Sequence, residues 1–248
     1  MKITAKGLIL TGLLGLGLTA AIPGTVMAEE EKPEADFTLG AYSQYVWRGF
    51  AFSDSSVVLQ PSMTVGYKGF GVNLWGNLDT DEKGLDTNNW NETDMTVSYD
   101  GSAGIVGYGV GWIYYNVDGA DDTQELYASV SVDTLLAPTL TYYADIANLP
   151  GSSYATLGIS HSISFTEKMA LDLGAQVGYL DDGADYSELH DGLVSASMSF
   201  ALGEYASITP ELYYSFALSN DAETAIKSVS YDGDDSHFYG GISASFAF

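Results

Sequence analysis

From Asp36 to the end of the chain, apolar and polar residues alternate in about twelve runs that are separated by turn residues. Successive side chains of a β-strand point to opposite faces, so each run predicts a strand with one apolar and one polar face. The expected strands cover residues 36–48, 56–67, 70–79, 92–100, 105–117, 124–133, 139–147, 153–165, 169–180, 192–202, 206–218 and 237–248. This repeat indicates an all-β fold.

The connections between these strands alternate in length. Those after even-numbered strands are tight turns such as Lys68-Gly69, whereas those after odd-numbered strands are longer and acidic. The longer connections cover residues 49–55, 80–91, 118–123, 148–152, 181–191 and 219–236. Short periplasmic turns and long outer loops are typical of outer-membrane barrels, and an even number of strands places both chain ends in the periplasm.

The two faces of the expected strands differ in size. Gly, Ser, Thr, Ala and Asn dominate one face, and large apolar residues occupy the other, with aromatic side chains near both strand ends, such as Phe70, Phe165, Tyr45, Trp47 and Tyr179. A soluble core would hold the large groups inside, so we expect the large face to meet lipid. An open sheet edge is not tolerated in hydrocarbon. The sequence therefore predicts a transmembrane antiparallel up-and-down β-barrel of twelve strands.

Residues 1–28 have the features of a secretory signal peptide. Lys2 and Lys6 precede an apolar stretch, and Val26-Met27-Ala28 fits a cleavage site of small residues. A permanent N-terminal anchor is the alternative, but the apolar stretch is shorter than the roughly 20 residues that a membrane-spanning helix needs. We expect a signal peptide at 1–28, a short periplasmic segment at 29–35 and the barrel at 36–248.

Charge and cysteine content exclude several classes of function. The formal net charge is −25, which excludes nucleic acid as a partner because phosphate binding needs a basic surface. The chain contains no cysteine, so disulfides, thiol nucleophiles and cysteine metal sites are excluded. We expect no cofactor.

The features of the two chain ends indicate the outer membrane of a Gram-negative bacterium. The expected partners there are the membrane lipid and the lipopolysaccharide layer. The last strand ends in Phe246-Ala247-Phe248, and a terminal phenylalanine in this setting resembles the signal that the barrel-assembly machinery reads. The resemblance implies that Phe248 contacts that machinery.

Strand parity turns Arg48, the single arginine of the chain, toward the barrel interior near its outer rim. Charges at a narrow point of a pore set its selectivity, whereas the alternative is an arginine whose side chain reaches to the membrane interface. The other candidate pore-lining residues are Gln60, Asn73, Asn77, Asp94, Glu125, Asp133, Asp145, Asp172, Gln176 and Glu211. Their excess of carboxylates predicts a preference for cations.

Acidic clusters in the outer loops are the candidates for metal binding, because hard divalent cations favour carboxylate oxygens. The candidate ligands are Asp121, Asp122, Asp181, Asp182, Asp234 and Asp235, although Asp- and Gly-rich stretches are also ordinary turn sequences. Catalysis is not expected. His161 falls at an apolar position, and a wet acidic rim accounts for His190 and His237 better than an Asp-His hydrolase does.

A short N-terminal motif carries a resemblance to a known family. The motif is Ser43-x-Tyr45-x-Trp47-Arg48-Gly49-Phe50, followed by Gln60, Gly69-Phe70 and Trp75-Gly76-Asn77. It resembles the N-terminal hallmark of the TorF family of porin-like outer-membrane proteins, and it covers about 35 residues. The resemblance implies a barrel with an inferred pore and no settled substrate.

Two functions are open on this evidence. The first is a passive channel for small hydrophilic solutes, because twelve strands lie between the roughly eight that fill solid and the roughly sixteen that clearly conduct. The second is a non-conducting structural or surface-interaction barrel whose acidic loops bind cations, partners or lipopolysaccharide. The connection 219–236 is long enough to fold inward and narrow the interior.

Overall fold

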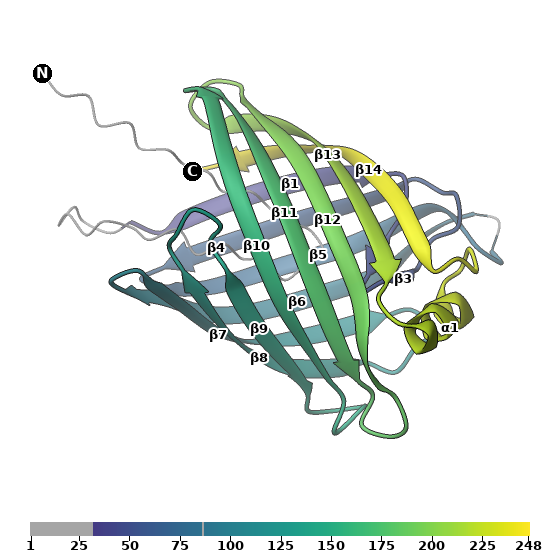
Figure 1. The fold of residues 1–248 in the computed structure, drawn as a ribbon. Coiled ribbons are helices and arrows are strands. Elements are labelled where there is room, and N and C mark those ends of the chain that lie inside the picture. The colour runs from purple at the N-terminus through teal and green to yellow at the C-terminus, as the bar shows by residue number, and fades with distance from the viewer. Residues whose placement is uncertain (1–31, 86) are drawn as a thin grey trace, which may run out of the picture.

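Twelve antiparallel strands close into a barrel in the computed structural model, which describes residues 32–85 and 87–248 (Figure 1). The wall strands are β1 (Glu34–Tyr42), β4 (Val58–Tyr67), β5 (Phe70–Glu82), β6 (Thr87–Ala103), β7 (Val106–Val117), β8 (Thr123–Val132), β9 (Thr139–Asp145), β10 (Ser153–Thr166), β11 (Met169–Asp181), β12 (Ser187–Ala201), β13 (Ala206–Ala217) and β14 (Ser236–Ala247). Strand β1 closes the ring against β14, with Phe37 opposite Phe246. The predicted fold class is confirmed, and the expected signal peptide at 1–28 lies outside the described residues.

The outward face of the wall is apolar on every strand. Neighbouring residues such as Val130 and Leu140, which pair across β8 and β9, are 50% and 56% exposed. Apolar exposure on this scale marks a surface that meets lipid. The other strands contribute Leu39, Val65, Leu74, Val97, Val110, Leu157, Leu173, Val194, Leu212 and Ile242 to the same face.

The two ends of the barrel differ in their connections. The C-terminus lies at one end, and α1 (Asn220–Val229) lies at the other (Figure 1). In barrels of this topology the end with the tight turns faces the periplasm, so α1 lies at the outer end. Within the described ranges, no helix has the length and apolar character to cross a membrane.

Several of the long connections contain more regular structure than the sequence indicated, and 80–91 and 219–236 show this most clearly. The expected loop 80–91 is mostly strand, because β5 and β6 keep pairing beyond the membrane, with Asp79 opposite Asn89 and Glu82 opposite Thr87. The connection 219–236 contains α1. Ser219 caps this helix, since its Oγ accepts a hydrogen bond from the backbone N–H of Ala222 at 3.1 Å.

The first strand is shorter than expected. Strand β1 ends at Tyr42, and the expected extension to residue 48 is wrong. Residues 43–57, here called the inward loop, turn into the barrel and form the short strands β2 (Val46–Trp47) and β3 (Phe50–Ala51). The inward loop places the candidate site.

Candidate functional site in the barrel interior

The inward loop is built around a tight two-residue turn. Trp47 pairs with Phe50, and the two residues between them have positive φ angles, 49° at Arg48 and 84° at Gly49. Two successive positive φ values are the signature of a type I′ turn, which suits the twist of a two-stranded hairpin. The turn therefore projects the Arg48 side chain from the tip of the loop.

Contacts with distant strands show that this hairpin lies inside the barrel. Tyr45 packs on Trp75 of β5, with ring centroids 5.6 Å apart, and Trp47 packs on Tyr115 of β7 at 6.0 Å. Nearly opposite in the ring, the Nε2 atom of His190 on β12 lies 3.1 Å from the backbone oxygen of Arg48. A segment that touches β5, β7 and β12 together must cross the interior.

Large aromatic side chains fill the outer half of the interior around this hairpin. The buried cluster consists of Tyr42, Tyr45, Val46, Ala51, Val58, Trp75, Leu193, Tyr213 and Tyr239, with Trp47 and Phe52 packed against it. The placement of Tyr45 and Trp47 in the outer lipid-facing girdle is wrong. The filled interior buries large side chains, as the lipid does. The alternation of apolar and polar residues along β1 therefore continues into the inward loop, although this loop is not part of the wall.

Arg48 is held by a carboxylate and by aromatic rings. Its Nη1 and Nη2 atoms donate to the two oxygens of Glu125 at 2.8 and 2.7 Å, in the paired geometry that a guanidinium and a carboxylate favour. The guanidinium carbon lies 4.3, 4.9 and 4.5 Å from the ring centroids of Trp47, Tyr143 and Tyr154. Burial lowers the pKa of Arg48, but Glu125 more than offsets this and holds it above its usual value. Arg48 therefore stays charged.

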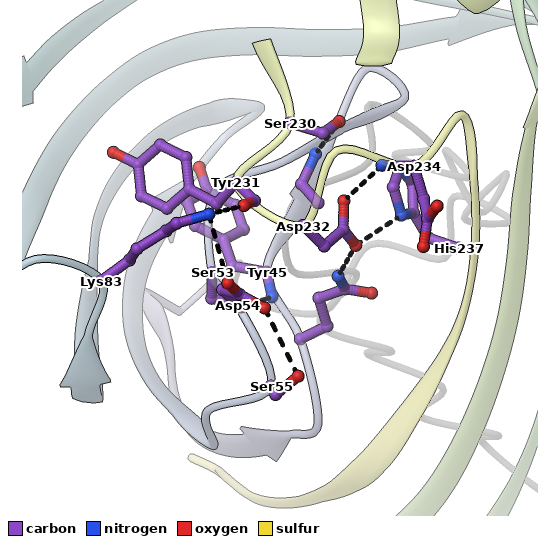
Figure 2. Close-up of polar contacts among 12 residues, drawn as sticks. Tyr45, Ser53, Asp54, Ser55, Lys83, Ser230, Tyr231, Asp232, Asp234 and His237 are labelled. Carbon is purple, nitrogen blue, oxygen red and sulfur yellow. Dashed lines mark hydrogen bonds and ion pairs between the residues drawn. The ribbon is translucent and has the colours of Figure 1, made fainter. Parts of the chain in front are cut away.

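The outer connections fasten the inward loop from outside (Figure 2). The backbone N–H of Ala51 donates to Ser230 Oγ at 3.1 Å, and the Ala51 carbonyl accepts from the N–H of Tyr231 at 2.8 Å. Lys83 Nζ lies 3.2 Å from Asp54 and also donates to the carbonyl of Tyr231. These bonds tie the loop to the segment that follows α1.

A second set of contacts fixes the base of the inward loop. Gln44 Nε2 donates to Asp232 Oδ2 at 2.6 Å, and His237 Nδ1 lies 3.1 Å from the same oxygen. Because His237 belongs to the wall strand β14, Asp232 connects the loop, the wall and the segment after α1 (Figure 2).

The periplasmic half of the interior has a different lining. Small polar side chains on the inward face remain partly exposed there, including Ser62, Thr64, Thr96, Ser98, Ser129, Ser195 and Ser197. Asp172 belongs to this partly exposed set, whereas Asp94 lies at the boundary with the filled half, directly opposite Trp75 and Tyr115. Each carboxylate has one buried oxygen without a hydrogen-bond partner. This half is polar and accessible, whereas the outer half is filled.

The structure places several of the predicted pore-lining residues in wall networks. Gln60 Nε2 donates to Asn77 Oδ1 at 3.0 Å, and both side chains are buried. Asn73 lies nearer the periplasmic end of β5, and its side-chain amide donates to Ser62 and Thr64. Gln176 is buried on β11. These amides are not brought together with Arg48, and the structure joins only Glu125 directly to it.

Glu211 is the centre of a separate buried network. Its carboxylate accepts from Tyr42 at 3.1 Å, from Ser243 at 2.7 Å and from Tyr213. Each hydroxyl donates to the acid, so the charge is satisfied within the wall.

Two expected interior acids have other positions. Asp133 lies exposed in the periplasmic turn, one residue past the end of β8. Asp145 is buried but caps an outer loop, because its Oδ1 accepts from the backbone N–H groups of Ala147 at 2.9 Å and Leu149 at 3.0 Å. Neither acid belongs to the partly exposed lining of the periplasmic half, although Asp145 lies opposite Glu125 in the register of β8 and β9.

The acidic outer loops stabilise their own turns. Asp182 Oδ1 accepts from the backbone N–H of Ala184 at 2.8 Å, and such bonds hold the pKa of Asp182 below its usual value. Asp181 accepts likewise from Gly183, Asp122 from Asn116, and Asp235 pairs with Lys227. In the described part of the chain, the His, Asp and Glu side chains form no group of three or more that could hold a metal ion, so Asp121, Asp122, Asp181, Asp182, Asp234 and Asp235 are not assembled into a metal site.

The aromatic partners of Arg48 were not among the predicted site residues. Tyr143 and Tyr154 are 7% and 3% exposed, although they lie on the inward face. The sequence contained an indication of these residues, because they are large aromatic side chains at inward positions where most other residues are small. Trp75 and Tyr213 depart in the same way.

Comparison with known proteins gives relatives by structure alone. No protein-family model and no curated protein matches the sequence. A structure of the NanC porin aligns with 86% of this chain and 98% of its own, at 12% identity and a TM-score of 0.55. An outer membrane channel from Pseudomonas putida F1 aligns with 92% of this chain and 99% of its own, at 10% identity and a TM-score of 0.50. At this identity the likeness concerns the fold.

The closed ring of strands, the apolar outer face and the polar interior define the class of protein. The chain is an outer-membrane β-barrel with porin architecture. Inside this barrel the inward loop carries Arg48 to Glu125.

Proposed function

We propose that the protein is an outer-membrane channel for the passive diffusion of small hydrophilic solutes. The observation that carries this proposal is the division of the interior, with a small polar lining in the periplasmic half and an inward loop in the outer half. A small polar lining that is accessible from the periplasm is what a diffusion path for hydrophilic solutes requires. The inward loop then acts as the constriction. The bonds that hold this loop to the wall and to the outer connections decide how wide the path is.

A preference for cations is part of the proposal. Arg48 is the only arginine of the chain, and Glu125 already neutralises it. Asp172 remains in the accessible half, where its carboxylate leaves a negative potential that raises the local concentration of cations, and Asp94 lies at the boundary of that half. We assign the pore-lining role to these two acids and, at the constriction, to Arg48 and Glu125.

A second candidate function rests on the buried cluster in the outer half. Nine tightly buried side chains would suit a barrel that is plugged permanently and serves a structural or surface role. In that case the acidic outer loops would associate with divalent cations at the lipopolysaccharide layer.

Two further assignments belong to this proposal. The first part of the motif that resembles the TorF family, Ser43 to Phe50, lies in the inward loop, and on this motif we propose that the chain belongs to that family. We also propose that the barrel-assembly machinery reads the last strand, where Phe248 is 74% exposed and its backbone pairs with Ala35.

Planar lipid bilayers separate the two functions. Purified wild-type barrel should give discrete conductance steps, and a salt gradient should give a reversal potential with the sign of cation preference. Absence of steps in a correctly folded preparation would favour the plugged barrel, and anion preference would refute the assignment of Asp94 and Asp172.

A further inference from the structure

The site that holds Arg48 belongs to the wall, whereas Arg48 itself belongs to the loop. Four residues on four consecutive wall strands form what we call the guanidinium cage: Tyr115 on β7, Glu125 on β8, Tyr143 on β9 and Tyr154 on β10. Tyr115 donates its hydroxyl to Glu125 Oε2 at 2.8 Å and so orients the carboxylate. The wall thus supplies a fixed acceptor pair and aromatic faces, which is what a planar cation needs.

Further carboxyl groups lie beside the cage. Asp94 lies directly opposite Tyr115 in the β6–β7 register, and Glu92 lies two residues away on the same strand. Among the described residues, Arg48 is the one lysine or arginine that pairs with an acid inside the barrel. Once Arg48 is removed, the cage carries an uncompensated carboxylate in a poorly solvated place, and this strongly favours a replacement cation.

A row of rings joins the cage to the accessible half of the interior. Tyr127 is partly exposed, and its ring centroid lies 5.7 Å from that of Tyr143, which lies 6.2 Å from that of Tyr154. Both ring pairs are tilted, at 39° and 36°, and rings at this spacing present a cation with one aromatic face after another. The row thus runs from the partly exposed Tyr127 to the buried rings of the cage.

We propose that the guanidinium cage is a binding site for solutes that carry a guanidinium or primary ammonium group, and that Arg48 occupies it as an internal stand-in for such a solute. The inference rests on the proposed channel function, since it names the solute class of that channel. A cationic solute competes with Arg48 for Glu125, and loss of this contact frees the tip of the inward loop.

Equilibrium binding to the refolded full-length mature barrel in detergent tests the cage without any need for conductance. In Arg48→Ala the cage is vacant, so calorimetry with millimolar guanidinium chloride should show binding that sodium chloride at equal concentration does not. The double variant Arg48→Ala/Glu125→Gln should bind guanidinium roughly tenfold or more weakly, because the charge-assisted pair is lost. The matched control Arg48→Ala/Asp172→Asn removes an acid elsewhere in the interior and should bind as Arg48→Ala does. Equal binding by both double variants would overturn the cage.

A second measurement keeps Arg48 in place, in case Arg48→Ala does not fold. Ala51 is fully buried beside the turn, and the chain has no cysteine of its own. In Ala51→Cys, millimolar agmatine, which bears both cationic groups, should speed modification by a thiol reagent several-fold, and sodium should not. An unchanged rate at saturating agmatine would overturn the displacement of Arg48.

The two proposals fail separately. Guanidinium binding by Arg48→Ala together with a silent wild-type barrel would remove the channel function and leave the cage. Conductance by the wild-type barrel without guanidinium binding by folded Arg48→Ala would remove the cage and leave the channel.

Discussion

Arg48 and Glu125 form a two-pronged ion pair inside the barrel, with N–O distances of 2.8 and 2.7 Å, although 77 residues separate them in the chain. Both side chains are almost fully buried, at 9% and 5% exposure. The pair links the tip of the inward loop to the wall.

Removing one partner of this pair should destabilise the barrel more than removing both. Glu125→Gln leaves the Arg48 guanidinium buried without its counter-charge, which costs about 3–5 kcal/mol. The double variant Arg48→Ala/Glu125→Gln leaves no unpaired charge and should recover part of this loss. Urea unfolding of detergent-refolded protein measures the difference. A double variant that is as unstable as the sum of the two single variants would show that the residues act independently.

Gly49 should be intolerant of a side chain for a steric reason. Its φ is +84°, and a Cβ atom would lie 3.0 Å from Ile226 Cδ1 and 3.1 Å from Asp191 Cβ. Gly84 is a matched control, because its φ is +88° and no atom lies within 4 Å of a Cβ there. Both changes to alanine carry the cost of the left-handed conformation, about 1–2 kcal/mol. Gly49→Ala should lower the urea midpoint of unfolding further than Gly84→Ala does. Equal shifts would mean that α1 and β12 are not packed tightly against the turn at Gly49.

The acids of the accessible half should control ion selectivity. Asp172→Asn removes a negative charge from the lining, so it should shift the reversal potential under a salt gradient toward zero. Asp94→Asn should shift it in the same direction but less, because Asp94 lies opposite the buried Trp75, where the neutral acid is favoured. Asp145→Asn is the control, because Asp145 caps the loop 146–152 and does not line the accessible half. If Asp145→Asn shifts selectivity as much as the other two, the assignment of the lining is incorrect.

The wall of the barrel could be predicted from the sequence because lipid and water impose opposite demands on alternate residues. Leu140 and Thr141 illustrate this, since the first is 56% exposed on the outer face and the second is buried inside. The tight turns could be predicted from the sequence equally well. Lys68 and Gly69 both have positive φ, as a two-residue hairpin turn requires.

The inward loop could not be predicted, because alternation reports polarity and not location. Tyr45 and Trp47 keep the period of β1, yet they pack among aromatic side chains in the filled interior and do not meet lipid. Helix α1 was readable in principle: Ser219 precedes Asp221 and Glu223 in the first turn, and Lys227 lies in the last. The alternation along the strands predicts that both Arg48 and Glu125 lie inside the barrel. It does not predict which interior acid pairs with Arg48, because that depends on the three-dimensional path of the inward loop.

Thiol labelling of single-cysteine variants tests the division of the interior most directly, because the natural chain has no cysteine. A charged, membrane-impermeant reagent should modify Ser129→Cys rapidly, since Ser129 lines the accessible half, and should leave its lipid-facing neighbour Ala128→Cys protected. Ser215→Cys, at 2% exposure in the filled half, should react slowly. Rapid labelling of Ser215→Cys would contradict the filled outer half, and faster labelling of Ala128→Cys than of Ser129→Cys would contradict the assignment of the two faces.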